Sequence, residues 1–349
     1  MLALQKVADK EGLELRDVPL PPAPAPGELA LDVVATGICG TDLGIQKWGA
    51  GYAAFMNKAL PVTLGHETVA RVRALGEGVT DFAIGDPVVI NPAIACGQCA
   101  ACTQGDPVGC LDRQAFGMIL DGAFARKVNV DARYAFRLPE AIPLELGALV
   151  EPLSVAMYAL DVAGFAPGDR VVVFGPGPIG QGAAVLARQM GAADVAVVGF
   201  QDGARFDTLC ALGVDQLFDA ADPAALDALR AFAGRGFDVA IEAAGVASVI
   251  DQALGLLKPQ GVLALAGMGE ASAPVDIGLV VRNRLQVRGV SRIPPRIWPE
   301  VIKLLAAAPE AFAGLVTHRL PLDQAQEAFA LARSGRASKI LLIPDDSQA

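Results

Sequence analysis

The chain has 349 residues, enough for about two domains of ordinary size, and 53% of them are hydrophobic against 19% charged, which excludes a disordered or low-complexity chain. The 38 aspartates and glutamates outnumber the 28 lysines and arginines, leaving a formal charge of −10 with no basic block, which argues against nucleic acid as a partner. Residues 1–10 lack the apolar run of a secretory signal, and the uncharged stretch 171–187 is too short and too rich in proline for a membrane span, so we expect a cytoplasmic protein.

The first third of the chain is predicted to be rich in strands. Residues 2–7 suit an extended start, and five prolines between positions 19 and 26 suit a polyproline-II-like connector. Residues 28–36 alternate well enough for a strand, and residues 63–90 hold short β-type runs separated by glycine and proline. This pattern is typical of small antiparallel strands and hairpins.

From about residue 144 onward, segments of strand length alternate with segments of helix length. Such alternation predicts a doubly wound domain, in which a parallel sheet is covered by helices on both faces. The expected strands are residues 170–174, 195–198, 237–241 and 261–266, and the expected helices are residues 179–190, 204–212 and 246–257. Beyond residue 289 we expect helices at 299–308 and 322–334 and a final strand at 337–343.

Four of the six cysteines lie close together in the sequence, as Cys96, Cys99, Cys102 and Cys110. Four thiolates at this spacing can complete a tetrahedral shell around Zn²⁺, and an all-sulfur shell leaves no position for a substrate, so the predicted zinc is structural. Disulfides and an iron–sulfur cluster are the alternatives. Disulfides in a large chain usually join distant segments, and the ferredoxin cysteine run is denser and ends in Cys-Pro, so both are disfavoured.

A second set of candidate ligands is spread along the chain. Cys39 lies beside glycines, His66 and Glu67 follow another glycine, and Glu151 precedes a proline. A single buried histidine is more often structural than catalytic. However, one thiolate, one imidazole and one or two carboxylates, with room for water, are the ligand set of an open catalytic zinc site. The four residues together favour that interpretation.

A glycine motif follows the strand predicted at residues 170–174 and opens the next helix. Gly175 allows a tight turn, Gly177 lets the backbone approach a pyrophosphate, and Gly180 permits close packing of helix on strand. Pro178 and Ile179 complete the motif, and the helix N-terminus would face the phosphates. The position at the start of a βαβ series favours a dinucleotide site over a merely structural turn.

The order of these motifs along almost the whole chain resembles the zinc-dependent medium-chain alcohol dehydrogenase family, and within it the sorbitol, polyol and threonine dehydrogenase branch. The resemblance rests on the cysteine lobe, the glycine motif and four further runs, which are GICGTD at 37–42, LGHE at 64–67, GDPV at 85–88 and EPLSV at 151–155. The last run stands where liver-type alcohol dehydrogenases carry a cysteine, which favours the polyol branch.

The resemblance implies an α/β fold made of two domains. A GroES-like, β-rich catalytic domain would comprise residues 1–156 and 290–349, with the structural-zinc lobe at about residues 91–112. A Rossmann domain with a doubly wound parallel sheet would comprise residues 157–289 and bind NAD(P).

The resemblance also implies that Cys39 and His66 bind the catalytic zinc, with Glu67 and Glu151 as direct or water-mediated ligands. Adjacent residues of a strand point to opposite faces, so His66 and Glu67 can both reach the metal only if the backbone bends near Gly65. This argument favours Glu151 as the partner of the bound water without ranking the two glutamates firmly.

Two further positions are assigned by the resemblance. Thr41 stands where the family keeps a hydroxyl that passes the substrate proton outward, whereas Gly44 replaces the histidine that ends this relay in many relatives, so the proton must leave through water or another group. Arg292 matches a substrate-contacting arginine at the domain junction. Ile293 and the spacing to Trp298 depart from the sorbitol dehydrogenase pattern, which leaves the substrate open.

The choice between NAD and NADP depends on the residues after the second predicted strand. NAD-specific sites place an acid about 20 residues beyond the glycines, but here the strand end carries Gly199 and Phe200. Arg205 could meet a 2′-phosphate, yet Asp202 and Asp207 flank it, and a dianionic phosphate normally needs more positive charge. We therefore expect NAD, with Asp202 in the role of the acid, and NADP as the alternative.

These features predict an enzyme that holds two zinc ions per chain and oxidises a secondary alcohol of a polyol, sugar or sugar derivative by hydride transfer to NAD(P). The resemblance also implies a homo-oligomer, a dimer or a tetramer. A threonine-type amino alcohol dehydrogenase is one alternative, encouraged by Thr41 and Trp48. A catalytically silent cofactor-binding relative is another, which the presence of both Cys39 and His66 disfavours.

Overall fold

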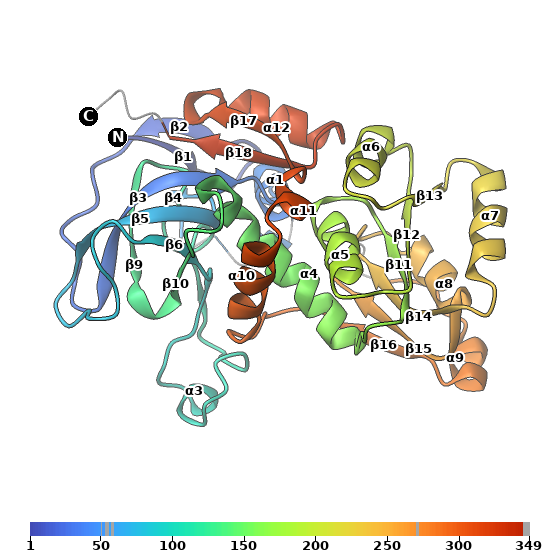
Figure 1. Cartoon of the computed structure of the whole chain (residues 1–349). Helices are drawn as coiled ribbons and strands as arrows, with labels where there is room; N and C mark the ends of the chain where they lie inside the picture. The colour runs from blue at the N-terminus through green and yellow to red at the C-terminus, as the bar shows by residue number, and fades with distance from the viewer. Residues whose placement is uncertain (50, 53–55, 57–58, 270–271, 345–349) are drawn as a thin grey trace.

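The computed structural model describes residues 1–49, 51–52, 56, 59–269 and 272–344. Both ends of the chain form a strand-rich body, and the middle of the chain forms a second body in which helices cover a parallel sheet (Figure 1). The predicted fold class, a β-rich domain combined with a doubly wound α/β domain, is confirmed.

Antiparallel pairing dominates the strand-rich body. Strand β3 (Glu28–Gly37) pairs with β5 (Glu67–Leu75) and with β9 (Lys127–Asp131), and among the described residues the sheet has the order β10-β6-β5-β3-β18-β17. The final strand, β18 (Lys339–Ile343), pairs with the end of β3 and so returns to the residues just before Cys39. The other elements are β1 (Leu2–Lys6), β2 (Glu14–Asp17), α1 (Gly40–Lys47), β4 (Val62–Thr63), β6 (Pro87–Ile90), β7 (Ala93–Ile94), α3 (Ala100–Thr103), β8 (Gln114–Ala115), the 3₁₀ helix η1 (Ala132–Tyr134), β10 (Ala135–Arg137), β17 (Val316–Pro321), the 3₁₀ helix η3 (Leu322–Gln324) and α12 (Ala325–Arg333).

The second body is built on a parallel sheet whose strands, within the described residues, have the order β13-β12-β11-β14-β15-β16. Its central strand, β11 (Arg170–Phe174), is almost entirely apolar because helices cover both faces of the sheet. This order is that of dinucleotide-binding folds, which bind ligand where the strand order reverses beside the first strand. The other elements are α5 (Pro178–Gln189), β12 (Asp194–Gly199), α6 (Gly203–Ala211), β13 (Gln216–Asp219), α7 (Pro223–Ala233), β14 (Phe237–Glu242), α8 (Ser248–Gly255), β15 (Leu257–Leu265), α9 (Ile277–Asn283) and β16 (Gln286–Gly289).

The predicted strands and helices of this body are present, with differences. The helix expected at residues 246–257 ends at Gly255, because β15 already begins at Leu257 and not at the expected residue 261. Strands β13 and β16 and helices α7 and α9 were not anticipated. Strand β13 has four residues, and Gln216 and Asp219 at its ends hide the apolar pattern that identifies longer strands.

Helix α4 (Val150–Ala163) continues the 3₁₀ helix η2 (Leu144–Leu149) and links the two bodies. Its buried side chains share one hydrophobic cluster with β11, α5 and the C-terminal helices. The segment Leu144–Ala163 is long and apolar enough to cross a membrane, but 78% of it is buried inside the protein. Its apolar surface therefore serves the core. The predicted domain boundary after residue 156 falls inside this helix and stays a prediction.

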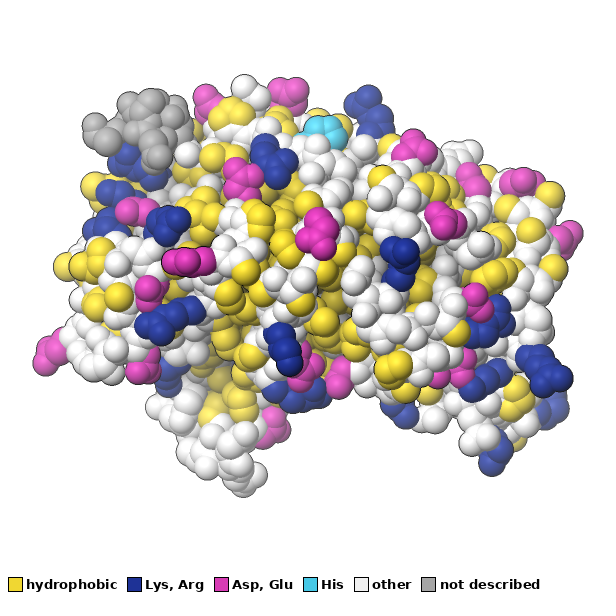
Figure 2. Space-filling model, in the orientation of Figure 1, with side chains coloured by type: hydrophobic (Ala, Val, Ile, Leu, Met, Phe, Trp, Pro, Cys, Tyr) yellow, Lys and Arg dark blue, Asp and Glu magenta, His cyan; other side chains and the backbone are white. Residues whose placement is uncertain are grey.

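Helix α10 (Ile297–Ala307) packs against α4. The short helix α11 (Glu310–Ala313) follows α10 in the chain. Trp298 of α10 is 1% exposed and stacks on Phe136 of β10, with ring centroids 5.5 Å apart. Hydrophobic side chains gather over the middle of this face of the molecule, where the two bodies meet (Figure 2). The junction between the bodies is therefore a packed core.

Candidate functional site

The turn between β3 and helix α1 positions Cys39. Cys39 is the N-cap residue of α1, and its backbone N–H donates to Asp42 Oδ2 at 2.9 Å, so Asp42 closes a capping box. Asp42 is fully buried. The backbone of Cys39 is thus fixed by the helix that it begins, and its thiol lies at the N-terminus of that helix.

A bend in the backbone brings His66 to Cys39. Gly65 has a φ of +97°, and a Cβ on it would lie 2.7 Å from the ring of Phe124, so only glycine fits there. Strand β5 starts after this bend, at Glu67. The bend that the sequence argument required for His66 and Glu67 is therefore present.

The imidazole of His66 lies between a thiol and a carboxylate. Its Nδ1 atom lies 3.6 Å from Asp42 Oδ1, and the thiol of Cys39 is close enough to act on the pKa of the ring. Burial disfavours the charged imidazolium, but Asp42, Cys39 and Glu151 together raise the pKa of His66 well above its ordinary value. The protein therefore surrounds this ring with groups that attract positive charge.

Glu67 is held by a lysine that the sequence argument did not single out. Lys339 Nζ donates to both carboxylate oxygens of Glu67, at 2.6 and 2.5 Å, and to the carbonyl oxygen of Ile38 at 2.9 Å. Both side chains are almost completely buried. Burial opposes the ammonium form of Lys339, but the charge of Glu67 overcomes it and raises the pKa of the lysine. The sequence held one sign of this lysine's role, since Lys339 is a charged residue at the start of the otherwise apolar strand β18.

Glu151 approaches the same cluster from the first turn of α4. Burial raises the pKa of its carboxyl to about 7, with His66 acting against this shift and Glu67 adding to it. No hydrogen bond to Glu151 is present among the described residues. The carboxylate of Glu151 is therefore more available to a metal ion than that of Glu67, because Lys339 binds both oxygens of Glu67.

The chemistry of this cluster fits a divalent cation. Cys39, Asp42, Glu67 and Glu151 can each carry negative charge, and they face the side chains of His66 and Lys339, whose pKa values are both raised. His66 Nδ1 and Asp42 Oδ1 are buried without a hydrogen-bond partner and face each other. A histidine that binds metal through one ring nitrogen usually directs the other toward a carboxylate, as His66 does here. Sulfur, imidazole and carboxylate are donors that zinc accepts.

The four-cysteine lobe projects from the strand-rich body (Figure 1). The four sulfur atoms of Cys96, Cys99, Cys102 and Cys110 all lie within 4.8 Å of one another and form no disulfide. Tetrahedral ligands at the usual Zn–S distance would be about 3.8 Å apart. Cys96 and Cys102 sulfurs lie 4.0 Å apart, and Cys99 and Cys102 sulfurs 3.5 Å apart.

Hydrogen bonds prepare these thiols for metal. Backbone N–H groups of Cys96 and Cys99 donate to the sulfurs of Cys110 and Cys96, both at 3.3 Å. Hydrogen bonds from Cys102 lower the pKa of Cys99 to about 6. Within the described part of the chain, this is the one group of potential ligands whose donor atoms all meet within that 4.8 Å limit. The cluster can therefore hold a structural zinc, as predicted.

The glycine motif follows the central strand β11, and its three glycines differ in their surroundings. Gly175 has a φ of +93° and faces the backbone of Ala244, so a Cβ there would lie 2.7 Å from the nearest atom. A Cβ on Gly180 would lie 2.0 Å from the carbonyl oxygen of Gly175. Around Gly177, the N-cap residue of α5, no atom would lie within 4 Å. Gly177 therefore leaves open space at the helix N-terminus, which suits an anion.

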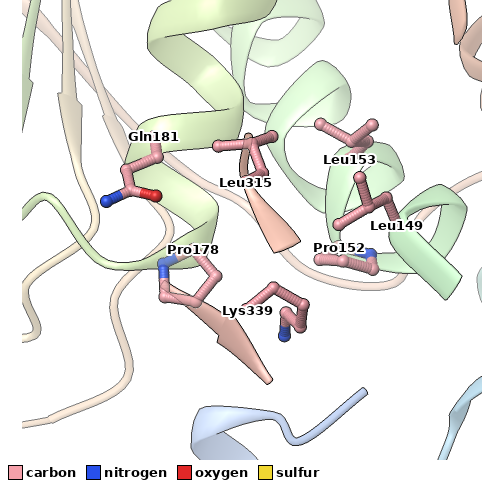
Figure 3. Close-up of a pocket in the computed structure, with 7 residues that line it drawn as sticks. All are labelled: Leu149, Pro152, Leu153, Pro178, Gln181, Leu315 and Lys339. Carbon is pink, nitrogen blue, oxygen red and sulfur yellow. The ribbon is translucent and has the colours of Figure 1, made fainter. Parts of the chain in front are cut away.

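Pro178 and Gln181 of this helix line a small crevice together with Lys339 (Figure 3). The remaining lining residues are apolar and come from α4, the segment before it and the end of the α11 region: Leu149, Pro152, Leu153 and Leu315. Ile179, the other predicted residue of the motif, packs against the central core. Lys339, which binds Glu67, therefore lies beside the glycine motif.

Asp202 and Arg205 lie at the start of α6, beyond strand β12. Arg205 Nη1 donates to Asp202 Oδ1 at 3.1 Å, and Arg205 Nε donates to the carbonyl oxygen of Ala337 at 3.2 Å. Asp202 Oδ2 accepts from the N–H of Phe200 at 3.0 Å. The candidate acid and the candidate cation are thus paired with each other.

Arg292 is exposed and has a φ of +60°. Its Nη1 donates to the carbonyl oxygen of Val108 in the cysteine lobe at 3.2 Å. The described hydrogen bonds therefore join Arg292 to the lobe and do not bring it to Cys39 or His66. Its role in substrate binding stays a prediction.

Two family models match the chain. Residues 25–140 match the alcohol dehydrogenase GroES-like domain, and residues 178–307 match the zinc-binding dehydrogenase domain. The chain belongs to the zinc-dependent medium-chain alcohol dehydrogenase family, as the order of its motifs predicted. It is an oxidoreductase, and zinc-dependent, NAD(P)-linked oxidation of a small alcohol is the activity that this family supports.

Similar proteins share nearly the whole length of the chain. D-xylulose reductase A of Aspergillus niger is 31% identical over 342 residues, which cover 96% of this chain and 94% of that protein. L-threonine 3-dehydrogenase of Stenotrophomonas maltophilia (strain K279a) is 32% identical over 344 residues, covering 98% and 99%. A crystal structure from Sinorhizobium meliloti 1021, described as a zinc-binding dehydrogenase bound to NADP, has a TM-score of 0.87 and 31% identity, covering 98% and 99%.

The glycines of the dinucleotide motif should respond differently to alanine. Gly180→Ala should lower the melting temperature, because its Cβ would collide with the carbonyl of Gly175. Gly177→Ala should leave the melting temperature unchanged and weaken binding of the nicotinamide dinucleotide by about tenfold, or ~1.4 kcal/mol. Thermal unfolding and calorimetric titration check the pair. Wild-type affinity in Gly177→Ala would contradict the assigned role.

The buried ion pair generates a stability prediction. Lys339→Met should reduce the free energy of unfolding by about 3–5 kcal/mol, because it leaves a buried carboxylate without its counter-charge. The double variant Lys339→Met/Glu67→Gln should recover part of this loss. Denaturant unfolding of chelator-treated protein measures both variants. Equal destabilisation in the single and double variants would show that the charge of Glu67 is not what Lys339 balances.

Proposed function

We propose that this enzyme oxidises a secondary alcohol, carried by a polyol, sugar or sugar derivative, to the ketone with NAD(P). The observation that supports this most directly is the crevice in which Lys339, whose ammonium group binds Glu67 next to His66, lies beside Pro178 and Gln181 of the helix that carries the glycine motif (Figure 3). The similarity to D-xylulose reductase A supports a polyol-type substrate. A screen of polyols, sugars and sugar acids with both cofactors, followed by the absorbance of the reduced nicotinamide, tests the proposal.

Cys39, His66 and Glu151 would hold the catalytic zinc, with Glu151 acting directly or through water. When bound, zinc polarises the alcohol oxygen and the nicotinamide accepts the hydride. Glu67 would keep its ion pair with Lys339 and contribute negative charge near the zinc ligands. Asp42 would orient the ring of His66 through its Nδ1 atom.

Thr41 would receive the proton of the alcohol. It lies two residues beyond Cys39 in the first turn of α1, where its hydroxyl can accept one proton and donate another. Gly175, Gly177, Pro178, Ile179 and Gly180 would bind the pyrophosphate of the cofactor through backbone groups at the start of α5.

A threonine-type amino alcohol dehydrogenase is the second candidate. The similarity to an L-threonine 3-dehydrogenase, at 32% identity over nearly the full chain, favours it. The same substrate screen separates the two candidates if it includes amino alcohols. The intact pair of Cys39 and His66 argues against a catalytically silent relative.

We further propose a cytoplasmic homo-oligomer, a dimer or a tetramer. Strand β16 lies at an edge of the parallel sheet, and all four of its residues are exposed. Val287 on this strand is 44% exposed, and Ile277 and Val281 of the preceding helix are 66% and 68% exposed. An exposed strand edge with apolar neighbours suits pairing with a second copy.

The oligomer proposal predicts that Val287→Lys shifts the protein toward the monomer, because a lysine on an exposed edge strand discourages pairing. Ile84→Lys is the matched control, since Ile84 is 71% exposed in the other body. Sedimentation velocity of the wild type and both variants measures the change. A monomeric wild type would refute the proposal.

The two metal sites predict two zinc ions per chain, measured by elemental analysis of protein purified without chelator. Cys99→Ser should lower the content to about one and reduce the melting temperature, because a closed zinc site stabilises the fold. His66→Ala should also lower the content to about one, abolish turnover and preserve cofactor binding. A wild-type content near one would remove one of the two sites.

The pairing of Asp202 with Arg205 predicts a moderate preference for NAD⁺ over NADP⁺, of about 1–3 kcal/mol in kcat/KM. Asp202→Ala should reduce or reverse this preference, because it removes the acid and frees Arg205 for a 2′-phosphate. Asp207→Ala is the control, because Asp207 is an exposed acid on the same helix. A wild type that prefers NADP⁺ would contradict the assignment.

A further inference from the structure

Tyr52 occupies the space that a side chain at position 44 would need. A Cβ built on Gly44 would lie 2.4 Å from Cε2 of Tyr52, 2.8 Å from its Cζ and 2.8 Å from its Oη. Separations this short are far inside van der Waals contact, so the phenol and any side chain at position 44 exclude each other. The ring of Tyr52 therefore fits against α1 because Gly44 has no side chain.

The hydroxyl of Tyr52 lies near Thr41. Thr41 and Gly44 lie three residues apart on helix α1, so they share one face of the helix. The phenol that covers Gly44 therefore lies on the face of the helix that carries Thr41, and Thr41 is close enough to act on the pKa of Tyr52. Burial, together with the nearby charges of Cys39 and Asp42, raises the pKa of Tyr52, while Thr41 opposes the shift. Tyr52 therefore stays a neutral phenol.

The order of these groups runs from the metal-binding residues outward. Cys39 begins helix α1, Thr41 follows in its first turn, and Tyr52 is half-buried against the helix. A backbone hydrogen bond from the N–H of Tyr52 to the carbonyl oxygen of Gly49, at 2.9 Å, ties the backbone of Tyr52 to a residue just beyond the end of α1. A half-buried hydroxyl can exchange protons with Thr41 on one side and with water on the other.

We infer that Tyr52 is the outer member of the proton path from the alcohol substrate, in the place where a side chain at position 44 would otherwise act. The inference rests on the proposed function. The alcohol proton moves to Thr41 Oγ1, the proton of Thr41 moves to Tyr52 Oη, and the proton of Tyr52 moves to bulk water. Each hydroxyl gains one proton and loses one, while the C–H hydride goes to the oxidised nicotinamide dinucleotide.

A kinetic comparison tests the path. Tyr52→Phe keeps the ring on Gly44 and removes the hydroxyl, so kcat should fall by about tenfold or more while the KM of the alcohol changes little. The remaining activity should rise toward higher pH, because water and hydroxide must take the proton. Tyr158→Phe is the matched control, two helical turns beyond Glu151 on α4. A Tyr52→Phe enzyme with the wild-type kcat and pH profile overturns the inference.

A stability cycle tests the same contact in metal-free, cofactor-free protein. Gly44→His should lower the melting temperature strongly when Tyr52 is present and much less in a Tyr52→Ala background. Equal effects in both backgrounds would show that the phenol does not occupy the space of residue 44, which overturns the inference. The double variant Gly44→His/Tyr52→Ala should also regain part of the turnover that Tyr52→Ala loses.

The two tests separate this inference from the proposed function. A wild-type protein that oxidises none of the alcohols in the screen refutes the proposed function and the proton path with it. A wild-type protein that oxidises an alcohol while Tyr52→Phe behaves like Tyr158→Phe refutes the path alone.

Discussion

The buried ion pair of Lys339 and Glu67 is the contact on which the geometry of the active centre depends. Removing two charges from water is costly, and only short, well-directed hydrogen bonds offset that cost. Here one ammonium group binds both oxygens of Glu67 and the carbonyl of Ile38, the residue before Cys39. It therefore joins the start of β5, the turn into α1 and the start of β18. These hydrogen bonds help to fix the positions of Cys39 and His66, which neighbour Ile38 and Glu67 in the chain.

The two candidate zinc sites obtain their geometry in different ways. In the lobe, one short stretch of chain supplies all four sulfurs, and local backbone N–H groups already point at two of them. At the other site, helix caps, a glycine bend and the first turn of α4 bring ligands together from distant segments. Asp42, Glu67 and Glu151 raise the pKa of His66 or Lys339 there, so the surroundings of the site favour positive charge. The ligand geometry of the lobe is consequently set within one short segment, whereas that of the other candidate site requires the tertiary fold.

This difference also explains how much could be predicted from the sequence. The cysteine spacing and the glycine motif carry their chemistry within a few residues, so their role follows from local geometry, and the alternation of strands and helices revealed the doubly wound sheet. Cys39, His66, Glu67 and Glu151 were connected by the donor atoms that they offer to zinc and by family resemblance, because spacing alone does not join distant residues. Lys339 and Tyr52 were missed, because the role of each depends on a tertiary contact. Lys339 binds Glu67, and Tyr52 fills the space beside Gly44. A buried lysine at the head of an apolar strand was the one local sign.

The return of β18 to β3 has a consequence for the order in which the protein matures. Lys339 lies 272 residues after Glu67 in the chain. During synthesis, which proceeds from the N-terminus, the segments bearing Cys39, His66 and Glu151 emerge while residues 36–37 at the end of β3 still lack their neighbour β18 and Glu67 lacks its counter-charge. An uncovered strand edge invites pairing with other chains. The end of β3 would thus stay open to other chains until β18 is made, and loading of a metal at the candidate site of Cys39, His66 and Glu151 would be a post-translational event that awaits the last strand.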